Sequence, residues 1–254
     1  MKIPKRVTVC PIINSVVEIR FQTKSNINAI QVFGSVYGFL LKSGSKPKVE
    51  NLAIMQLPDN IRTNDPSLRY KPWFKITVDD YSIFVGSDVF SISSTVPYKS
   101  WLSFFDQINT FFSYLLDSDV IESVVRIGVR YVNYFHKDIT DDLTLTINFP
   151  SVNRVKNLTL SYQIEEGDFQ NTVIFSNNAM IRNTVGEPEI TQGEKNFEVG
   201  CILDIDSYKE FKGLKNVSKE QIIDYIDSAH ETEKSIFFSL LTDSLIESLG
   251  PKYE

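Results

Sequence analysis

Three arginines on two predicted strands are the residues whose type and spacing most favour binding chemistry. In the central stretch, residues 123–133, alternation puts Arg126 and Arg130 on one face of a strand. Arg20 lies on the corresponding face of the first predicted strand. Each guanidinium offers a fork of donors that suits a phosphate or a carboxylate. Together with Asn133, which ends the central motif, these arginines are our candidate ligand-binding residues.

The same arginines have a structural alternative. Carboxylates on neighbouring strands, such as Glu18, can pair with guanidinium groups as ordinary cross-strand contacts. If the two halves of the chain are related, Glu18 and Arg126 occupy equivalent positions, which favours this pairing. Ligand binding and pairing within the sheet are therefore both open for Arg20, Arg126 and Arg130.

The two histidines point to no metal or catalytic motif. His136 follows the central strand, and His230 lies in the last predicted helix, where we expect a solvated face. A helical zinc-protease motif would need a second histidine at the position of Lys234. Gly-rich phosphate loops, nucleophile elbows and paired-cysteine motifs are also missing from the sequence. We expect no metal site and no cofactor, and the catalytic residues, if any, are not identified.

Two predicted strands must hold the arginines. Residues 9–22 form the first, in which Val17, Ile19 and Phe21 alternate with mainly polar positions and face a core. The central strand alternates in the same way, so its apolar side faces the core and its arginine side faces away. Its inward residues are predicted to be Val125, Ile127, Val129, Tyr131 and Phe135.

Three helices are predicted to cover the apolar side of the sheet. The first spans Asn26–Lys42, beginning at a cap on its asparagine, and Gly34 and Gly38 would let it lie close to the sheet. An aromatic stripe through residues 97–116 marks the second. The third spans residues 218–250 and begins with a capping box.

Shorter segments complete the predicted fold. A meander of three strands is expected over residues 68–94, because turn residues separate three apolar runs. Glycine, proline and charged residues predict a loop over residues 182–196. Further strands are expected at residues 143–149, 158–164, 172–180 and 197–205. The fold class is therefore α+β, with antiparallel sheet packed against long helices.

The composition is that of an ordinary soluble globular protein. Hydrophobic residues make up 42% and charged residues 23%. The formal charge of −6 argues against non-specific binding to nucleic acid or to anionic membranes. With two cysteines and no apolar run long enough to span a bilayer, we expect a cytoplasmic protein without a membrane segment.

The two halves of the chain resemble each other. The segment at residues 15–19 matches residues 123–127, and residues 111–117 resemble residues 237–243. We treat residues 1–254 as a single unit that contains two pseudo-repeats, at 7–119 and 120–254. A duplicated strand-helix-four-strand-helix unit would resemble the saddle of TATA-binding proteins or a helix-grip fold. Short apolar matches also arise by chance, so the duplication stays open.

A set of motifs along the chain resembles a family of known proteins. The motif from Arg126 to Asn133 is the most specific of them, and Glu18–Phe21, Phe33 with Gly34, Gln56–Pro58 and Trp101 accompany it. Together they are similar to a sporadically distributed family of uncharacterised prokaryotic proteins of about this length. The resemblance covers nearly the whole chain and implies a single full-length unit from a prokaryote. It supplies no catalytic residues.

Two functional hypotheses follow. The first is a non-enzymatic binding protein that holds a protein partner or a small anionic ligand on its arginine-bearing sheet face. The alternative is an enzyme that acts on a phosphorylated or nucleotide substrate, with the arginines stabilising charge and His136 or a carboxylate as base. A homodimer, built through sheet edges or the last helix, is compatible with both.

Overall fold

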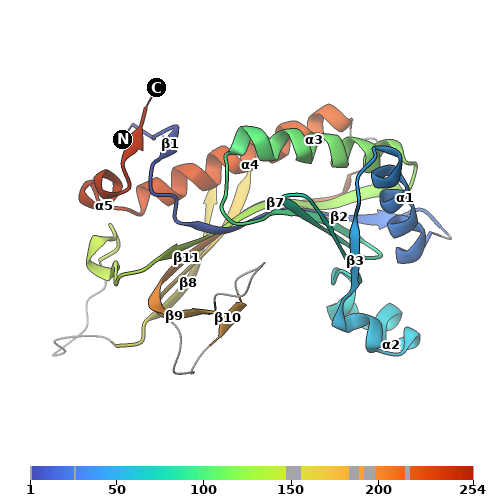
Figure 1. Cartoon of the computed structure of the whole chain (residues 1–254), viewed down its shortest axis with the longest axis horizontal. Coiled ribbons are helices and arrows are strands. Elements are labelled where there is room, and N and C mark those ends of the chain that lie inside the picture. The colour runs from blue at the N-terminus through green and yellow to red at the C-terminus, as the bar shows by residue number, and fades with distance from the viewer. Residues whose placement is uncertain are drawn as a thin grey trace.

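The fold is α+β, as predicted: one large antiparallel sheet packs against helices (Figure 1). The computed structural model describes residues 2–25, 27–146, 156–182, 189–191, 198–214 and 218–253. The strands of the main sheet are β2 (Ile12–Thr23), β3 (Lys48–Asn51), β4 (Phe74–Val78), β5 (Tyr81–Val85), β6 (Val89–Ser94), β7 (Ile121–Phe135), β8 (Thr159–Glu166), β9 (Phe169–Arg182), β10 (Glu189–Thr191) and β11 (Glu198–Leu214). The helices are α1 (Ala29–Lys42), α2 (Asp59–Asn64), α3 (Trp101–Asp117), α4 (Lys219–Ser239) and α5 (Asp243–Ser248).

The two halves of the chain share this ten-stranded sheet. Its strand order is β10-β9-β11-β7-β2-β6-β5-β4-β3, and β8 pairs with β9. The pair β2–β7 therefore joins the strands of residues 7–119 to those of residues 120–254. The duplication and the saddle-like arrangement stay predictions, because strand order alone does not establish them. A separate two-stranded sheet joins β1 (Arg6–Val7) to β12 (Pro251–Lys252), near the N- and C-termini.

Helices α1, α3 and α4 cover one face of the sheet. Figure 1 shows α3 and α4 running along this face above β7 and β2. Ile19 and Ile127 from these strands are fully buried in one core with Val36 of α1, Phe112 of α3 and Ile226 of α4. The predicted alternation in the first strand is confirmed, since Val17, Ile19 and Phe21 all lie in this core. No helix in the described ranges is long and apolar enough to cross a membrane.

One predicted core position in the central strand is wrong. Phe21 pairs with Val124, whereas the preceding Arg20 pairs with Arg126, so Val125 has no opposing residue in this ladder. An extra residue in one strand is a bulge and changes the side on which the following side chains lie. Val124 consequently takes the core position expected for Val125. From Arg126 onward the predicted alternation is confirmed as far as Tyr131.

The helix boundaries differ from those predicted because local caps decide them. Asn28 caps α1, where its Oδ1 accepts hydrogen bonds from the backbone of Ile30 and Gln31. Ser100 caps α3, three residues after the predicted opening at Pro97. At α4 the predicted capping box of Ser218 with Gln221 is confirmed, but the helix ends at Ser239 and a separate helix, α5, follows.

Three sequence predictions fall partly on residues outside the described ranges. These are the cap at Asn26, the later part of the strand predicted over residues 143–149, and most of the loop predicted over residues 182–196. Of the described residues in that predicted loop, Arg182 ends β9 and Glu189–Thr191 form β10. Leu143 makes only an isolated bridge to Leu241, and no strand begins there.

The glycines that allow close packing are not the predicted pair. A Cβ at Gly34 or Gly38 would meet nothing within 4 Å, so α1 does not need them to approach the sheet. A Cβ at Gly200 would overlap the backbone oxygen of Phe135, which cannot move without disturbing the β7–β11 ladder.

We therefore expect Gly200→Ala to destabilise the protein by about 1–3 kcal/mol, as overpacking does. Gly38→Ala is the matched control and should raise stability by up to about 1 kcal/mol, because alanine favours a helix. Urea unfolding of both variants checks the two signs. A neutral Gly200→Ala variant would contradict the close contact.

Candidate functional site

Arg126 is buried within the sheet rather than presented to solvent. Its Nη1 donates to Glu18 Oε1 at 2.9 Å, and its Nη2 donates to Asp206 Oδ2 at 2.7 Å. The guanidinium also lies over the ring of Tyr208, 4.3 Å from the centroid. Two carboxylates and an aromatic ring thus fix this side chain on the sheet face opposite the long helices.

Gly128 makes room for that arrangement. A Cβ at this position would lie 2.7 Å from Nη1 of Arg126, so a side chain here would displace the guanidinium. The glycine between the two arginines of the central strand is therefore part of the ion-pair geometry. This gives a physical reason for its place in the motif.

Arg130 and Arg20 are also paired. Arg130 donates through Nε and Nη2 to the two oxygens of Asp204, at 2.8 and 2.5 Å, and 50% of its side chain is exposed. Arg20 donates to Glu18 at 2.7 Å and lies over the ring of Tyr70. These contacts are the ion pairs with neighbouring carboxylates that the structural alternative describes. Ligand binding by this arginine face, which we define by Arg20, Arg126 and Arg130, stays a prediction.

Asn133 does not lie with the arginines. It alternates with Tyr134 and so faces the helix side of the sheet, together with Tyr131 and Phe135. Its side chain is buried, and Nδ2 donates to the backbone oxygen of Leu203 at 3.2 Å. The structure therefore separates this candidate from the arginine face.

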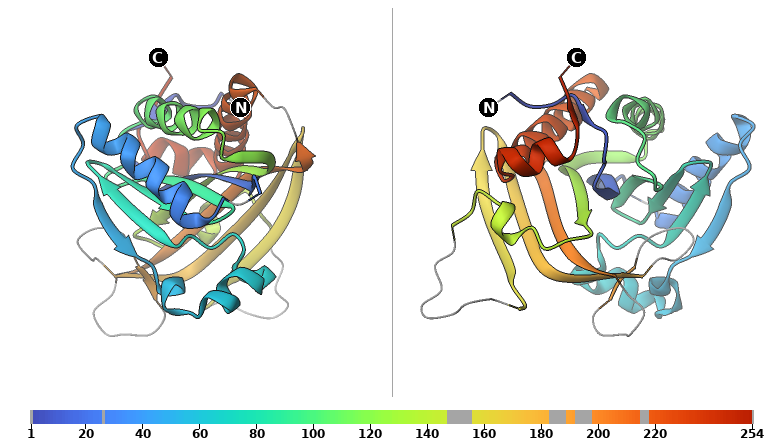
Figure 2. Two further views of the ribbon diagram at one scale, coloured as in Figure 1. Left: turned by 90° about the vertical axis from the view of Figure 1, so that its right-hand side faces the viewer. Right: turned by 60° about the vertical axis from the view of Figure 1, so that its left-hand side comes forward.

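A cavity of about 570 Å³, which we call the α4 cavity, lies on the helix side next to Asn133. Its walls come from α4, the start of α3, β7 and the N-terminal segment at residues 4–12. In the right-hand view of Figure 2 this segment, in dark blue, passes between α4 and α3. A volume of this size lies within the range of small-molecule sites.

A chain of hydrogen bonds connects three rings along the wall of the α4 cavity. Tyr98 Oη lies 3.2 Å from Tyr131 Oη, which lies 3.1 Å from Nδ1 of His230. Trp101 stacks on the His230 ring with centroids 3.9 Å apart, and its Nε1 donates to Asp227. The expectation that His230 lies on a solvated face is wrong, because the side of α4 that carries His230 packs against β7 and α3.

Burial keeps these rings in their neutral forms. Desolvation lowers the pKa of His230 to about 3, with the charge of Lys234 adding to the effect. Desolvation also raises the pKa values of Tyr98 and Tyr131 above the ordinary value for tyrosine. Near neutral pH the hydrogen-bonded chain of rings therefore consists of two phenols and an uncharged imidazole.

We expect His230 to show no protonation step between pH 5 and pH 8, since its pKa of about 3 lies below this window. Nuclear magnetic resonance titration of the imidazole carbon-bound protons checks this, and a His230→Gln variant identifies the signal. A midpoint near 6.5 for the His230 signal would contradict the buried environment.

Glu233 is the most unusual group of the α4 cavity. It is 4% exposed, and its Oε1 has no hydrogen-bond partner among the described residues. Desolvation raises its pKa well above the ordinary value, the negative charge of Asp204 adds to the rise, and Lys234 opposes it. A buried carboxyl oxygen without a partner is rare in proteins and costs about 1–3 kcal/mol. This unpaired oxygen distinguishes Glu233 from the other residues that line the cavity.

The sequence contained a signal for this site that our interpretation did not use. Ile222, Ile226 and Ala229 define the inward stripe of α4, and helical spacing continues that stripe through His230 and Glu233. Polar residues on the apolar stripe of a helix indicate either buried hydrogen-bonded pairs or a functional site. The partners of this stripe, from the N-terminal segment and α3, come from distant parts of the chain and carry no local pattern.

The comparisons with family models and with curated proteins give no assignment for this site. Among the described residues, no group of three or more potential ligands is arranged to hold a metal ion. The resemblance to a sporadically distributed prokaryotic family, based on the motif from Arg126 to Asn133, stays a prediction. No family model matches the chain, and no curated protein matches it.

Proposed function

We propose that the chain is a binding protein whose small-molecule ligand occupies the α4 cavity. The observation that carries this proposal is the buried Glu233 carboxyl, which lines the cavity and has an unpartnered Oε1. A folded protein keeps such an oxygen at a cost in stability. A ligand that forms a hydrogen bond with this carboxyl would remove that cost.

The shape and chemistry of the lining support a ligand of organic composition. Aromatic side chains of Trp101, Tyr131 and Phe237 supply apolar surface, and a few polar groups lie among them. Small-molecule sites commonly combine a mainly apolar wall with a small number of placed polar groups. The cavity volume of about 570 Å³ is consistent with this class.

The protonation states favour binding over acid-base catalysis. An efficient general acid or base has a pKa near the working pH. The pKa of His230 lies at about 3, and the pKa values of Tyr98 and Tyr131 are raised. These three groups are suited to hydrogen bonding in their neutral forms, so an enzyme acting on a phosphorylated substrate is the less favoured reading.

The test is native mass spectrometry of protein purified from its host without denaturation. Cys10→Trp should fill the α4 cavity and abolish a retained small-molecule mass, because this residue lines the wall. Val9→Trp is the matched control, since its neighbouring side chain is 60% exposed and does not line the cavity. The proposal is contradicted if both variants retain the same mass. It is also contradicted if the wild-type protein retains none and a panel of metabolites does not stabilise it.

The arginine face is a second candidate surface, for a protein partner. Its support is the exposure of Arg130 and Arg20, whose side chains are 50% and 33% exposed. Three carboxylates, those of Glu18, Asp204 and Asp206, accompany the three arginines. This balance favours a mixed-charge protein surface over a free anion. The double variant Arg20→Ala/Arg130→Lys should lose a co-purifying protein with little change in melting temperature, and an unchanged set of co-purifying proteins would count against it.

A further inference from the structure

β8 is an open edge strand of the main sheet. It pairs with β9 on one side, and no strand among the described residues pairs with its other side. In the right-hand view of Figure 2, β8, in yellow, is the outermost strand on the left of the sheet. An edge strand presents a row of backbone N–H and C=O groups that can pair with a further strand. The sheet can therefore be extended at β8.

The outward-facing backbone groups of β8 belong to alternate residues. The backbone oxygen of Leu158, just before β8, accepts a hydrogen bond from Asn177 of β9 at 3.1 Å. The backbone oxygen of Ile164 accepts one from the side chain of Asn171, also on β9, at 3.4 Å. Because this direction alternates along a strand, the backbone groups at the odd positions between them face away from β9. These positions are Thr159, Ser161 and Gln163.

β8 lacks the features that usually protect an edge strand. Very short strands, lysine, proline and bulges are common means of preventing pairing at an edge. β8 is eight residues long, contains neither lysine nor proline, and pairs with β9 in one continuous register. The strand at the opposite edge, β3, has four residues and begins with Lys48. β8 is therefore the edge better suited to pairing with another chain.

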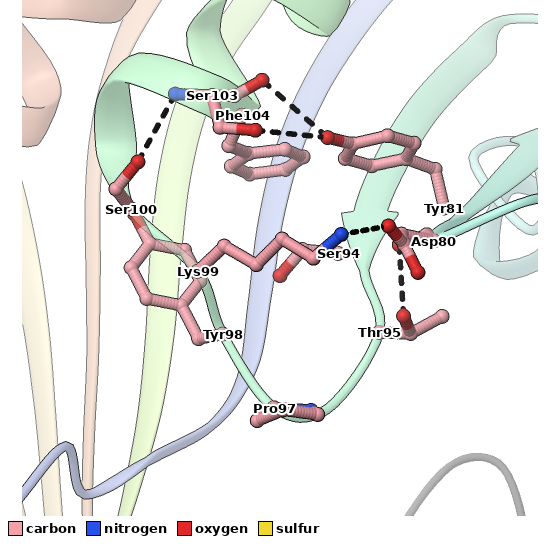
Figure 3. Close-up of a pocket in the computed structure, with 10 residues that line it drawn as sticks. All are labelled: Asp80, Tyr81, Ser94, Thr95, Pro97, Tyr98, Lys99, Ser100, Ser103 and Phe104. Carbon is pink, nitrogen blue, oxygen red and sulfur yellow. Dashed lines mark hydrogen bonds and ion pairs between the residues drawn. The ribbon is translucent and has the colours of Figure 1, made fainter.

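A small pocket at the start of α3 offers no comparable site. Its volume is about 10 Å³, and the ion pair between Lys99 and Asp80 lies across it, as Figure 3 shows. Such a volume holds no more than a water molecule. This pocket is too small for a ligand, unlike the open row of donors and acceptors on β8.

The sequence of β8 is complementary to itself in one antiparallel register. With Ser161 of one copy opposite Ser161 of a second, Leu160 lies opposite Tyr162. The next apolar pair in this register is Leu158 with Ile164, which is 36% exposed and would be covered. These pairs lie on the helix side of the sheet, where the start of β8 already packs against a core shared with α4 and α5. Apolar pairs of this kind stabilise neighbouring strands.

The charges at the two ends of β8 favour a second copy as its partner. Lys156 precedes the strand, Glu165 and Glu166 end it, and all three are exposed. Antiparallel pairing places the start of each strand beside the end of the other, so the lysine of each copy lies near the glutamates of the second. A register centred on Tyr162 would instead place Leu158 opposite Glu166. The register centred on Ser161 is therefore favoured.

We propose that two copies of the chain form a homodimer in which β8 pairs with β8 of the second copy, antiparallel and centred on Ser161. The outward backbone groups of Thr159, Ser161 and Gln163 then form about six hydrogen bonds across the junction. This number is within the usual range for a protein interface. β8 does not line the α4 cavity, so dimer formation is separate from the proposed ligand binding.

Sedimentation equilibrium of the full chain tests the association. We expect twice the mass of the chain at about 50 µM, as a dissociation constant in the low micromolar range or below requires. Ser161→Pro should weaken the association at least about tenfold, because proline has no N–H to donate at the centre of the junction. This variant should still fold, since an edge strand tolerates proline where its N–H faces outward. A monomeric wild-type protein at this concentration would overturn the inference, including where β8 binds a different protein.

Val49→Pro on β3 is the matched control. Leu52 donates its backbone N–H to Trp73 at 2.9 Å, and alternation then turns the N–H of Val49 away from β4. Val49→Pro therefore removes an outward N–H from the opposite edge, and the dimer should form as in the wild-type protein. If Ser161→Pro still dimerises, or if Val49→Pro is monomeric, the interface lies elsewhere and the inference fails.

Cysteine cross-linking tests the register without a proline. In a Cys10→Ser background, which removes the exposed native cysteine, Ser161→Cys should form a disulfide between copies in oxidised glutathione. The two Cα atoms would lie about 5.5 Å apart, within disulfide range. Gln163→Cys is the control on the same face, because Gln163 lies opposite Thr159 and the two new cysteines would be about 13 Å apart. Equal cross-linking of both variants, or of neither, would overturn the proposed register.

Discussion

Replacing Arg126 with alanine is expected to cost about 3 kcal/mol of unfolding free energy, a large part of the stability of an ordinary domain. The side chain is 7% exposed and is the shared partner of Glu18 and Asp206. Its removal leaves two carboxylates close together without their cation, and also removes the contact with Tyr208. The two carboxylates keep part of their exposure, so the loss should lie at the lower end of the range for buried pairs.

Arg20→Ala is the matched control for this prediction. Arg20 is 33% exposed, and its partner Glu18 still accepts a hydrogen bond from Arg126 after the change. Its loss should cost below about 1 kcal/mol, as exposed ion pairs do. Urea unfolding at neutral pH measures both. Equal costs for the two variants would mean that Arg126 is not the centre of the ion-pair network.

The second large effect is a dependence of stability on pH that comes from Glu233 and His230. Glu233 has a raised pKa when folded, so above pH 4.5, its ordinary value, the unfolded chain releases a proton that the folded protein keeps. Stability then falls as pH rises, until Glu233 ionises in the folded protein. His230, with a folded pKa of about 3 against 6.5, has the opposite effect, because the unfolded chain binds the extra proton between these values.

Between pH 4.5 and 6.5 the effects of Glu233 and His230 on stability oppose each other. Outside this range only one of the two residues makes stability depend on pH. Below pH 4.5 stability should fall with decreasing pH because of His230. Above pH 6.5 it should fall with increasing pH because of Glu233. Each slope is at most about 1.4 kcal/mol per pH unit.

The Glu233→Gln variant isolates the effect of Glu233, which lowers stability as the pH rises. The stability of this variant minus that of the wild-type protein should grow with pH from pH 4.5 upward, by up to about 1.4 kcal/mol per pH unit. Urea unfolding of ligand-free protein at several pH values provides the curve, with Glu50→Gln as the control. A difference that stays constant between pH 5 and pH 8 would mean that Glu233 is already ionised in the folded protein. Asp204 and Lys234 are the charged groups that act on Glu233 most directly.

Much of the fold follows from local patterns in the sequence. Alternation in β2 identified Val17, Ile19 and Phe21 as core residues, and the same pattern put Arg20, Arg126 and Arg130 on the opposite face. The aromatic stripe of α3 and the capping box of α4 were equally readable. These features depend on residues close in sequence, and such patterns are specified by the backbone period.

The remaining features depend on contacts between distant segments. The bulge at Val125 moves one core position from Val125 to Val124, and the local alternation gives no sign of it. Asp204 and Asp206, the partners of Arg130 and Arg126, come from a strand more than 70 residues away. The α4 cavity needs the N-terminal segment, α3, β7 and α4 together, so its volume cannot be read from any one of them.

The most direct test of a ligand at Glu233 is a crystal structure of the protein purified from its host without denaturation. We expect density for an organic molecule in the α4 cavity, with a polar atom about 2.7–3.2 Å from the carboxyl group of Glu233. A cavity that contains only ordered water, with Oε1 satisfied by that water or by Lys234, would contradict the proposal.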